Sequence, residues 1–374
     1  MKIGILTYHF AVNYGALLQC YALQQAFESQ GADCVVCDYQ SPVQRDNNLL
    51  YSKKKSPKAI GKNLCKLPFH HARKRKQQKF QRFVAEKLTL SAPLATLEAL
   101  KKEADRLDAI VSGSDQVFSP HIPDFDGAFF LPFPTHAQKA SYAASLGKTK
   151  AAQLLPYKDA LLDFDFLTVR EASSLSGIRE LGISGVETAP DPVFLLTREQ
   201  WRTLARADRP LKQEPYLLCY FLDAERERQY LKIAEEMAEK RHLKLYRVVS
   251  RYRPYNLSRS AICDAGPEDF LNLIANAAFV CTDSFHGTVF SAMFGVDFVT
   301  FCPHKNQPDQ RKQEILRALG LEDRLRFADE PMKATAFDPV DITEPLAAQR
   351  ARGLDVVQRI MDWGCVKNEN TGDY

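Results

Sequence analysis

The chain has 374 residues, of which 45% are apolar and 26% charged, and its formal net charge is +4. These values are typical of a folded globular protein and exclude disordered, collagen-like and fibrous classes. Because the length exceeds what one hydrophobic core usually serves, we expect two domains. No apolar run reaches the roughly 18 residues that a bilayer-spanning helix needs, and we see no signal peptide, so we expect a cytoplasmic protein.

Short apolar stretches alternate with amphipathic ones along the chain. Strands are predicted at residues 2–7, 33–38, 107–111, 140–144, 166–169, 186–189, 216–222, 243–249, 279–282 and 297–301. Helices are predicted at 15–29, 171–180, 224–240 and 289–294, with a long C-terminal helix at 342–363. This alternation indicates parallel sheets covered by helices on both faces.

The predicted fold class is therefore α/β, with two Rossmann-like domains that face each other across a cleft. We assign residues 1–165 to the first domain and 166–374 to the second. The boundary falls near 160–170, with a position as late as 210 as the alternative.

A basic insertion at 45–90 interrupts the first domain. Residues 45–79 contain twelve Lys or Arg against one Asp, and the run Arg73–Lys76 leads into apolar residues at helical spacing. One interpretation is a solvated helix face. The other is a patch that contacts an anionic surface, either membrane phospholipid or a phosphorylated carrier. Because the patch lacks interleaved aromatics and a nucleic-acid motif, we predict no nucleic-acid binding.

The nine cysteines are an odd number, and Cys34 and Cys37 form the one C-x-x-C pattern. These two positions lie three apart on a predicted strand, so their side chains point to opposite faces. We expect reduced, structural cysteines. The eight histidines form no ligand-spaced cluster, and we predict no metal site.

In open α/β sheets, ligands bind at the carboxyl ends of the strands, and three windows lie there. The first is residues 8–15, where Gly15 opens a helix whose N-terminus favours an anion. It has neither a G-x-G-x-x-G pattern nor a P-loop, so it does not indicate a dinucleotide cofactor. An ordinary strand-to-helix turn is the alternative.

The second window, residues 111–116, places Ser114, Asp115 and Gln116 after a strand. They supply hydrogen-bond donors, an acceptor and a candidate base. Serine and aspartate also cap helices, so a structural role stays open.

The third window, residues 281–288, precedes an apolar helix and places His286 at its start. Histidine exchanges protons near neutral pH. Its position directly before Gly287 and Thr288, at the carboxyl end of a strand, favours a functional role over a structural one.

Six segments resemble, in order and spacing, the polysaccharide pyruvyl transferase family. They are Asn13–Gln19, Gly113–Val117, Ser141–Ser145, Val169–Glu171, Asp191–Pro192 and Thr282–Thr288. The resemblance runs from residue 1 to about 320. It implies two Rossmann-like domains similar to GT-B glycosyltransferases, with the first domain on the acceptor side and the second on the donor side.

The resemblance also implies an activity and its substrates. The enolpyruvyl unit of phosphoenolpyruvate, a co-substrate, moves onto a sugar and closes to a pyruvate ketal, and phosphate leaves. No further cofactor is implied. Typical acceptors are lipid-linked repeat units of bacterial capsular, exopolysaccharide or cell-wall polymers at the inner face of the cytoplasmic membrane. The basic segment 45–88 would then hold the enzyme peripherally near an anionic membrane.

The predicted roles combine this resemblance with the chemistry of the residues. We expect His286 to act as the acid and Asp115 as the base. Donor contacts are expected from Arg170, whose guanidinium could hold the carboxylate, and from Ser284, Gly287 and Thr288. Acceptor contacts are expected from Asn13, Tyr14, Gly15, Ser114 and Gln116.

The motif at the third window departs from the family in one position. Family members carry Arg-Leu-His where this chain has Ser284-Phe285-His286, and serine cannot replace the arginine charge. Either another cation replaces it, with Arg251, Arg253, Lys305 and Arg311 as candidates, or the donor differs. Two alternatives therefore stay open: a GT-B glycosyltransferase that uses a nucleotide sugar, and a non-catalytic scaffold in polysaccharide assembly.

Overall fold

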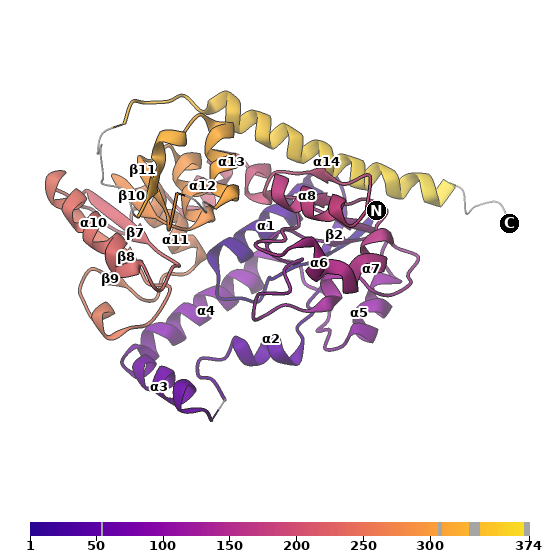
Figure 1. Cartoon of the computed structure of the whole chain (residues 1–374), viewed down its shortest axis with the longest axis horizontal. Helices are drawn as coiled ribbons and strands as arrows, with labels where there is room; N and C mark the ends of the chain where they lie inside the picture. The colour runs from indigo at the N-terminus through magenta and orange to yellow at the C-terminus, as the bar shows by residue number, and fades with distance from the viewer. Residues whose placement is uncertain (54, 306–308, 329–336, 370–374) are drawn as a thin grey trace. The chain divides into compact units, whose positions relative to one another are not determined.

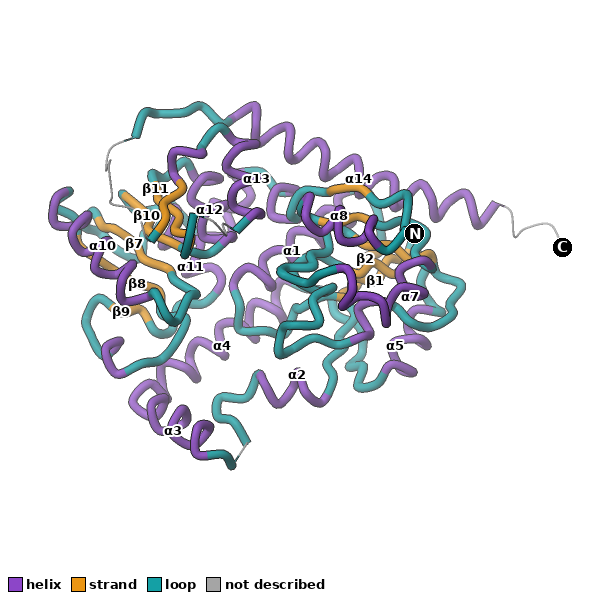
Figure 2. Tube along the Cα trace, in the orientation of Figure 1, coloured by secondary structure: helices purple, strands orange, loops and turns teal. Residues whose placement is uncertain are grey.

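The computed structural model describes residues 1–53, 55–305, 309–328 and 337–369 (Figure 1). The chain forms two compact units. The first takes in Met1–Leu49, Gln81–Leu196 and the chain from Ala347 on, and the second takes in Leu50–Phe80 and Thr197–Leu346. In each unit, helices flank a set of parallel strands (Figure 2).

The first unit is built on a four-stranded parallel sheet in the order β2-β1-β3-β4. Its strands are β1 (Lys2–Leu6), β2 (Asp33–Val36), β3 (Ala109–Ser112) and β4 (Gln138–Ser141). A short parallel pair follows, β5 (Thr168–Val169) and β6 (Glu187–Thr188). Isolated bridges from Ala140 to Phe166 and from Ala144 to Val169 join this pair to the chain around β4.

The helices of the first unit include two that extend across its boundaries. They are α1 (Tyr14–Ser29), α2 (Pro42–Asn47), α4 (His70–Lys87), α5 (Leu97–Ala104), α6 (Ala151–Leu154), α7 (Lys158–Leu162), α8 (Ala172–Glu180) and α14 (Thr343–Glu369). Helix α4 begins in the second unit, as does α14. The predicted C-terminal helix at 342–363 is therefore present and runs six residues further.

The second unit contains a six-stranded parallel sheet in the order β12-β11-β10-β7-β8-β9. Its strands are β7 (Tyr216–Tyr220), β8 (Lys244–Val248), β9 (Ala261–Ile262), β10 (Phe279–Thr282), β11 (Phe298–Cys302) and β12 (Leu325–Phe327). Its remaining helices are α3 (Pro57–Lys66), α9 (Arg198–Ala205), α10 (Glu227–Lys240), α11 (Pro267–Ala275), α12 (Phe285–Phe294) and α13 (Gln310–Leu319). The central strands β7, β10 and β11 are fully buried, as expected for a sheet covered on both faces.

The predicted α/β class with two Rossmann-like halves is confirmed, but the division of the chain differs from our prediction. We predicted a boundary at 165–166, whereas the first unit continues to Leu196. The reason is that β5 aligns with the chain around β4 through backbone bonds, including Arg170 N to Ala144 O at 3.0 Å. Residues 50–80 of the basic insertion, which we assigned to the first domain, belong to the second unit.

The basic run in α4 is not the fully solvated face that one interpretation required. The Arg73 guanidinium lies 5.1 Å from the ring centre of Tyr51 and 5.3 Å from that of Tyr252. Lys76 is 5% exposed, and its Nζ donates to Val249 O at 3.1 Å. Burial lowers the pKa of Lys76 to about 8. Arg73 and Lys76 therefore pack inside the second unit and contribute to its structure.

The described cysteines carry no disulfide, and most are buried. Burial raises the pKa of Cys37 to about 12, which keeps this thiol protonated and unreactive. Among the residues that the structure describes, no group of His, Cys, Asp and Glu could hold a metal ion. Within the same residues, no helix has the length and apolar character needed to cross a membrane.

Candidate functional site

The turn after β3 is tightly joined to its neighbours at the carboxyl edge of the first sheet. Thr7 Oγ1 donates to the Ser114 carbonyl oxygen at 2.9 Å. Ser114 Oγ donates to Ala143 O at 2.9 Å, which ties the turn to the segment after β4. A Cβ on Gly113 would lie 2.9 Å from the Cβ of Thr7, so the close approach of β1 and β3 here requires glycine.

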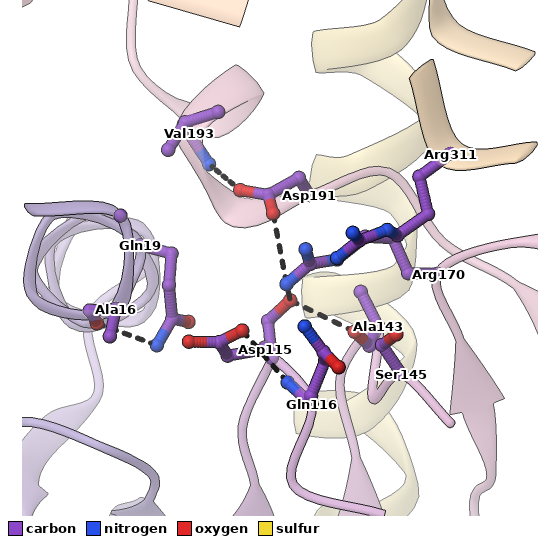
Figure 3. Close-up of polar contacts among 12 residues, drawn as sticks. Ala16, Gln19, Asp115, Gln116, Ala143, Ser145, Arg170, Asp191, Val193 and Arg311 are labelled. Atoms are coloured by element: carbon purple, nitrogen blue, oxygen red, sulfur yellow. Dashed lines mark hydrogen bonds and ion pairs between the residues drawn. The ribbon is translucent and has the colours of Figure 1, made fainter. Parts of the chain in front are cut away.

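Arg170 lies buried behind this turn, in an ion pair with Asp191 (Figure 3). Its Nη2 is 3.0 Å from Asp191 Oδ2, and the two side chains are 4% and 0% exposed. The same Nη2 donates to Ser114 Oγ at 2.6 Å. Asp191 Oδ1 accepts from Val193 N at 3.0 Å and so caps the 3₁₀ turn Pro192–Leu195.

These contacts give Arg170 and Asp191 a structural role that sequence reasoning missed. We had predicted that Arg170 binds the donor carboxylate, and that role stays a prediction. Asp191 was noted as part of the family resemblance but was given no partner. The ion pair connects residues 21 apart in sequence, and no local spacing reveals it.

Two further segments of the resemblance meet at a buried carboxylate. Glu171 is 2% exposed, and its Oε1 accepts from Ser145 Oγ at 2.6 Å and from Ser174 Oγ at 2.5 Å. Ser145 Oγ also accepts from Gly147 N at 3.1 Å. The segments after β4 and β5 are therefore fixed to each other, which holds this edge of the sheet in one arrangement.

Asp115 and Gln116, the predicted base and a predicted acceptor ligand, are partly exposed at this edge (Figure 3). Asp115 has a φ of 77°, a left-handed conformation that costs a non-glycine residue free energy. Its Oδ1 accepts from Gln116 N at 2.8 Å, and its carbonyl oxygen accepts from Ser145 N at 2.9 Å. The surrounding hydrogen bonds therefore maintain the strained backbone of Asp115. Its carboxylate lies at the edge of the sheet where we expect ligands.

The turn after β1 uses its predicted acceptor residues to start α1. Asn13 is the N-cap, and its Oδ1 accepts from Gly15 N at 3.1 Å and from Ala16 N at 3.4 Å. Tyr14 is 2% exposed and belongs to the core. The alternative of an ordinary strand-to-helix turn explains these contacts, and acceptor binding by the three residues Asn13, Tyr14 and Gly15 stays a prediction.

His9, in the same turn, pairs with a carboxylate that we did not connect with it. Its Nε2 lies 3.0 Å from Asp38 Oδ1, and its Nδ1 lies 3.1 Å from Thr7 O. The hydrogen bond from His9 holds the pKa of Asp38 below its ordinary value. The adjacency of β1 and β2 in a parallel sheet could have indicated this pair, because both residues follow the carboxyl ends of those strands.

In the second unit, the predicted donor residues Ser284, Gly287 and Thr288 build the start of α12. Ser284 is the N-cap, and its Oγ accepts from Gly287 N at 3.2 Å. Thr288 Oγ1 donates to Ser284 O at 2.9 Å and lies in hydrogen-bond contact with Thr300 Oγ1 at 2.8 Å. A Cβ on Gly287 would lie 2.5 Å from Thr282 Oγ1, so this turn also requires glycine.

His286 is the second residue of α12 and is 9% exposed. Its ring lies edge-on to the Phe285 ring, with centroids 5.2 Å apart. The position is one where backbone N–H groups and the helix dipole favour an anion. The structure thus places the predicted acid in the first turn of a helix, next to three predicted donor residues.

Asp283, immediately before the cap, accepts from two backbone N–H groups in the loop after the neighbouring strand β7. Its Oδ1 accepts from Leu222 N at 2.6 Å and its Oδ2 from Asp223 N at 2.7 Å. Burial raises the pKa of Asp283, against the opposing effect of these hydrogen bonds. The Lys312 Nζ donates to the Asp283 carbonyl oxygen at 3.0 Å, which fixes a positive charge beside this turn.

Arg311 brings a second cation to the same place. Its Nε lies 3.0 Å from Asp309 Oδ1 and its Nη2 lies 2.8 Å from Asp309 Oδ2. Its Cζ is 5.8 Å from the ring centre of Phe285, the residue after Ser284. Burial acts to raise the pKa of Asp309, but the charge and hydrogen bonds of Arg311 outweigh it and hold that pKa below its ordinary value.

The four candidate replacements for the family arginine therefore differ in position. Arg251 and Arg253 are exposed in the loop after β8, and Lys305 is exposed after β11. Arg311 lies beside Phe285 and so contacts residues 284–288, which we call the Ser284 turn. Sequence reasoning missed Lys312, because we predicted no helix at the position of α13.

Solved structures of low sequence identity share this fold. UDP-GlcNAc 2-epimerase from Methanocaldococcus jannaschii aligns with a TM-score of 0.53 and 15% identity, over 96% of this chain and 99% of that one. The Rickettsia bellii UDP-N-acetylglucosamine 2-epimerase gives 0.51 and 8%, over 99% and 98%. The Neisseria meningitidis UDP-GlcNAc 2-epimerase bound to UDP-GlcNAc gives 0.50 and 10%, over 96% and 99%. At these identities the similarity establishes the fold alone, which is GT-B-like.

The search of curated proteins gave no match. A sequence model of one family does match, over residues 13–304, and its description is polysaccharide pyruvyl transferase. The matched range includes the parts of the candidate site described above: Asn13 in the turn after β1, the turn after β3, Arg170, Asp191 and the Ser284–Thr288 turn. Because this range covers most of the chain, the protein belongs to the polysaccharide pyruvyl transferase family.

Proposed function

We propose that the protein transfers the enolpyruvyl unit of phosphoenolpyruvate to a sugar of a polysaccharide repeat unit, where it closes to a pyruvate ketal. Family membership supports a transferase of this kind. The observation that carries the proposal is the Ser284 turn. His286 lies there in the first turn of α12. Arg311 contacts the preceding residue, Phe285, and Lys312 donates to the carbonyl oxygen of Asp283.

The two anionic groups of the proposed donor determine which residues its binding site needs. Phosphoenolpyruvate carries a phosphate and a carboxylate, so it needs at least one fixed cation together with a helix N-terminus or a second cation. The start of α12 offers backbone N–H groups, and Arg311 offers a planar guanidinium that is 23% exposed. We propose that Arg311 supplies the charge that Ser284 lacks. Its present partner, Asp309, would then act as the group that orients it.

The proposed chemistry assigns one proton transfer to His286. As imidazolium, it gives a proton to the methylene carbon of the donor, and the neighbouring carbon gains oxocarbenium character. A sugar hydroxyl attacks that carbon and releases its proton. The carbon–oxygen bond to phosphate then breaks, and a second hydroxyl closes the ketal. Of the two hydroxyl protons, one restores His286. The other is taken by the base, which we propose is Asp115, and is released with phosphate, so the reaction balances.

We propose that the acceptor sugar binds at the carboxyl edge of the first sheet. Asp115 is partly exposed there, and its carboxylate could accept the hydroxyl proton. Gln116 lies beside it in sequence and offers an amide group of the kind that sugars bind. The hydroxyl of Ser114 is buried and bonded to Ala143 and Arg170, so we assign it to the support of this turn. The lipid linkage of the acceptor belongs to the same proposal and derives from the family resemblance.

Ligand-dependent stabilisation tests the donor without knowledge of the acceptor. The melting temperature of the full chain would be measured with phosphoenolpyruvate, UDP-sugars and CMP-sugars. A ligand at about 100 times its Kd adds roughly 2.7 kcal/mol to the free energy of unfolding, which raises the melting temperature by several degrees. We expect this shift with phosphoenolpyruvate, and we expect Arg311→Ala to reduce it.

Arg317→Ala is the matched control, since Arg317 is an exposed arginine of the same helix. It should keep the full shift. Arg170→Ala is unsuitable as a ligand test because it removes the cation that faces the buried Asp191 carboxylate. Stabilisation by a nucleotide sugar in place of phosphoenolpyruvate would overturn the proposal in favour of a glycosyltransferase.

A further inference from the structure

Helix α3 of the second unit presents three large apolar side chains to solvent. Ile60, Leu64 and Leu67 are 50%, 59% and 54% exposed. Their spacing of four and three residues places them on one face, because Leu67 continues the helical backbone after Lys66. The result is a continuous apolar stripe, which we call the α3 stripe.

The outward orientation of the α3 stripe is fixed by contacts on another side of the helix. Ala59 is 9% exposed and packs inward. Asn63 exchanges two hydrogen bonds with the backbone of Ser52: its Oδ1 accepts from Ser52 N at 3.1 Å, and its Nδ2 donates to Ser52 O at 2.9 Å. Ser56 caps the N-terminus by accepting from Ala59 N at 3.3 Å. The helix is therefore docked, with its apolar stripe left uncovered.

The α3 stripe lies in an entirely basic stretch of sequence. Residues 47–85 contain no Asp or Glu. Lys53, Lys55 and Lys62 are exposed around the helix, and Lys66 is half-buried on it. Burial and the charges of Arg73 and Lys62 lower the pKa of Lys66, so these three cations repel one another.

Four cations of α4 contact groups of the second unit, and Lys53, Lys55 and Lys62 are exposed beside the α3 stripe. Arg75 Nε lies 2.8 Å from Asp264 Oδ2, and Lys79 Nζ lies 2.7 Å from Asp269 Oδ2. Arg73 and Lys76 are buried. The exposed lysines beside the α3 stripe therefore give that stripe a basic flank.

We propose that α3 docks the protein on an anionic lipid bilayer. Ile60, Leu64 and Leu67 enter the boundary between headgroups and acyl chains, and the surrounding lysines contact lipid phosphates. An exposed apolar face next to a basic one is the pattern of helices that lie in the membrane interface. Each lysine near an anionic surface strengthens binding about fivefold at physiological salt. The inference concerns a surface apart from the proposed donor site and holds whichever donor is used.

Vesicle flotation of the full chain tests this inference. The protein would be mixed with vesicles of phosphatidylcholine alone or with 30% phosphatidylglycerol, at about 0.05 M and 1 M salt. We expect recovery with the anionic vesicles at low salt and much less at high salt, where the Debye length falls to about 3 Å. The triple variant Ile60→Ser, Leu64→Ser, Leu67→Ser should lower the apparent affinity at least tenfold.

The matched control is Leu211→Ser with Leu257→Ser, which removes two apolar side chains of the same unit that are 51% and 61% exposed. It should bind as the wild type does. All variants should keep the wild-type melting temperature, because the replaced side chains are exposed. Lys55→Glu with Lys62→Glu should abolish the preference for anionic vesicles.

Three results would overturn the inference. One is equal recovery with neutral and anionic vesicles. Another is unchanged binding by the triple variant. The third is a dimer in sedimentation that the triple variant dissociates, with no flotation of the wild type, because the α3 stripe would then join two copies of the chain.

Discussion

The two units present an arginine at the carboxyl edge of a parallel sheet in two different ways. In the first unit, Arg170 and Asp191 form an ion pair whose side chains are 4% and 0% exposed. In the second, Arg311 and Asp309 form a pair whose side chains are 23% and 24% exposed. The first pair holds the turn after β3 in place. The second lies near the start of α12, where we propose that Arg311 binds the donor.

This difference shows why residue type and position at a strand end do not identify a binding arginine. Arg170 directly follows β5, and Arg311 lies in the first turn of α13, so the sequence places both near the carboxyl ends of strands. What separates them is whether the carboxylate partner is buried with the cation. Removal of one member of a buried pair leaves the other without compensation, whereas an exposed pair contributes little.

The largest effect on stability should come from Arg170→Ala. We expect it to lower the free energy of unfolding by about 3–5 kcal/mol, because Asp191 would stay buried without its cation. Urea unfolding followed by circular dichroism measures this. Arg75→Ala is the control, since it breaks a pair with side chains 57% and 31% exposed and should cost less than about 1 kcal/mol. Equal costs for the two variants would remove the distinction between buried and exposed pairs.

A smaller effect should come from Gly287→Ala in the Ser284 turn. The new methyl group would lie 2.5 Å from Thr282 Oγ1, which accepts from Ser284 N and donates to Tyr220 O. We expect a loss of about 1–3 kcal/mol from overpacking. Thermal or urea unfolding measures it.

Gly61→Ala provides the opposite case in the same unit. A Cβ there meets nothing within 4 Å, and the residue lies inside α3. Alanine should stabilise the protein by about 0.5–1 kcal/mol. If Gly287→Ala were as well tolerated as Gly61→Ala, the Ser284 turn would not be the close-packed structure described above.

The smallest effect concerns the acid range of pH. The folded-state pKa of Asp309 lies below its ordinary value. The stability that this carboxylate contributes is therefore present above the ordinary carboxyl range and is lost as pH falls through the lowered pKa. Arg311→Ala removes the cation that lowers it and leaves burial, which raises the pKa.

We expect Arg311→Ala to reduce the loss of stability on acidification, because the folded-state pKa of Asp309 then lies closer to its unfolded value or above it. The change should stay below about 1 kcal/mol for this partly exposed pair. Unfolding curves between about pH 2 and 6 for wild type and Arg311→Ala would reveal it. Superimposable pH profiles would show that Arg311 and Asp309 do not interact in solution.

Sequence patterns predicted the architecture well where elements are long and apolar. The strands around Tyr216–Tyr220 and Phe279–Thr282 and the helix at Tyr14–Ser29 have clear periodicity, and alternation alone indicated parallel sheets. Two short strands, Ala261–Ile262 and Leu325–Phe327, were missed because two or three residues carry no period. The boundary was placed too early because β5 looks like the start of a new series and is in fact bonded to the chain around β4.

The candidate site was predicted less completely than the fold. The Ser284–Thr288 turn was found because its residues are adjacent in sequence. The pairs Arg170–Asp191 and His9–Asp38 were missed because each joins segments that only the folded sheet brings together. Both interpretations of the basic run Arg73–Lys76, a solvated face and an anion-contacting patch, required exposed side chains. Two of its members are instead buried against partners far along the chain.

The most direct test of the proposed activity is transfer of label from [¹⁴C]phosphoenolpyruvate to polysaccharide precursors by wild type and His286→Gln. The variant keeps a polar side chain in the first turn of α12 but cannot donate a proton as imidazolium. We predict incorporation by the wild type and a loss of about 10²–10⁴-fold in the variant, with an unchanged melting temperature. Equal incorporation by the two proteins would show that His286 is not the acid, and no incorporation by either would contradict the pyruvyl transfer itself.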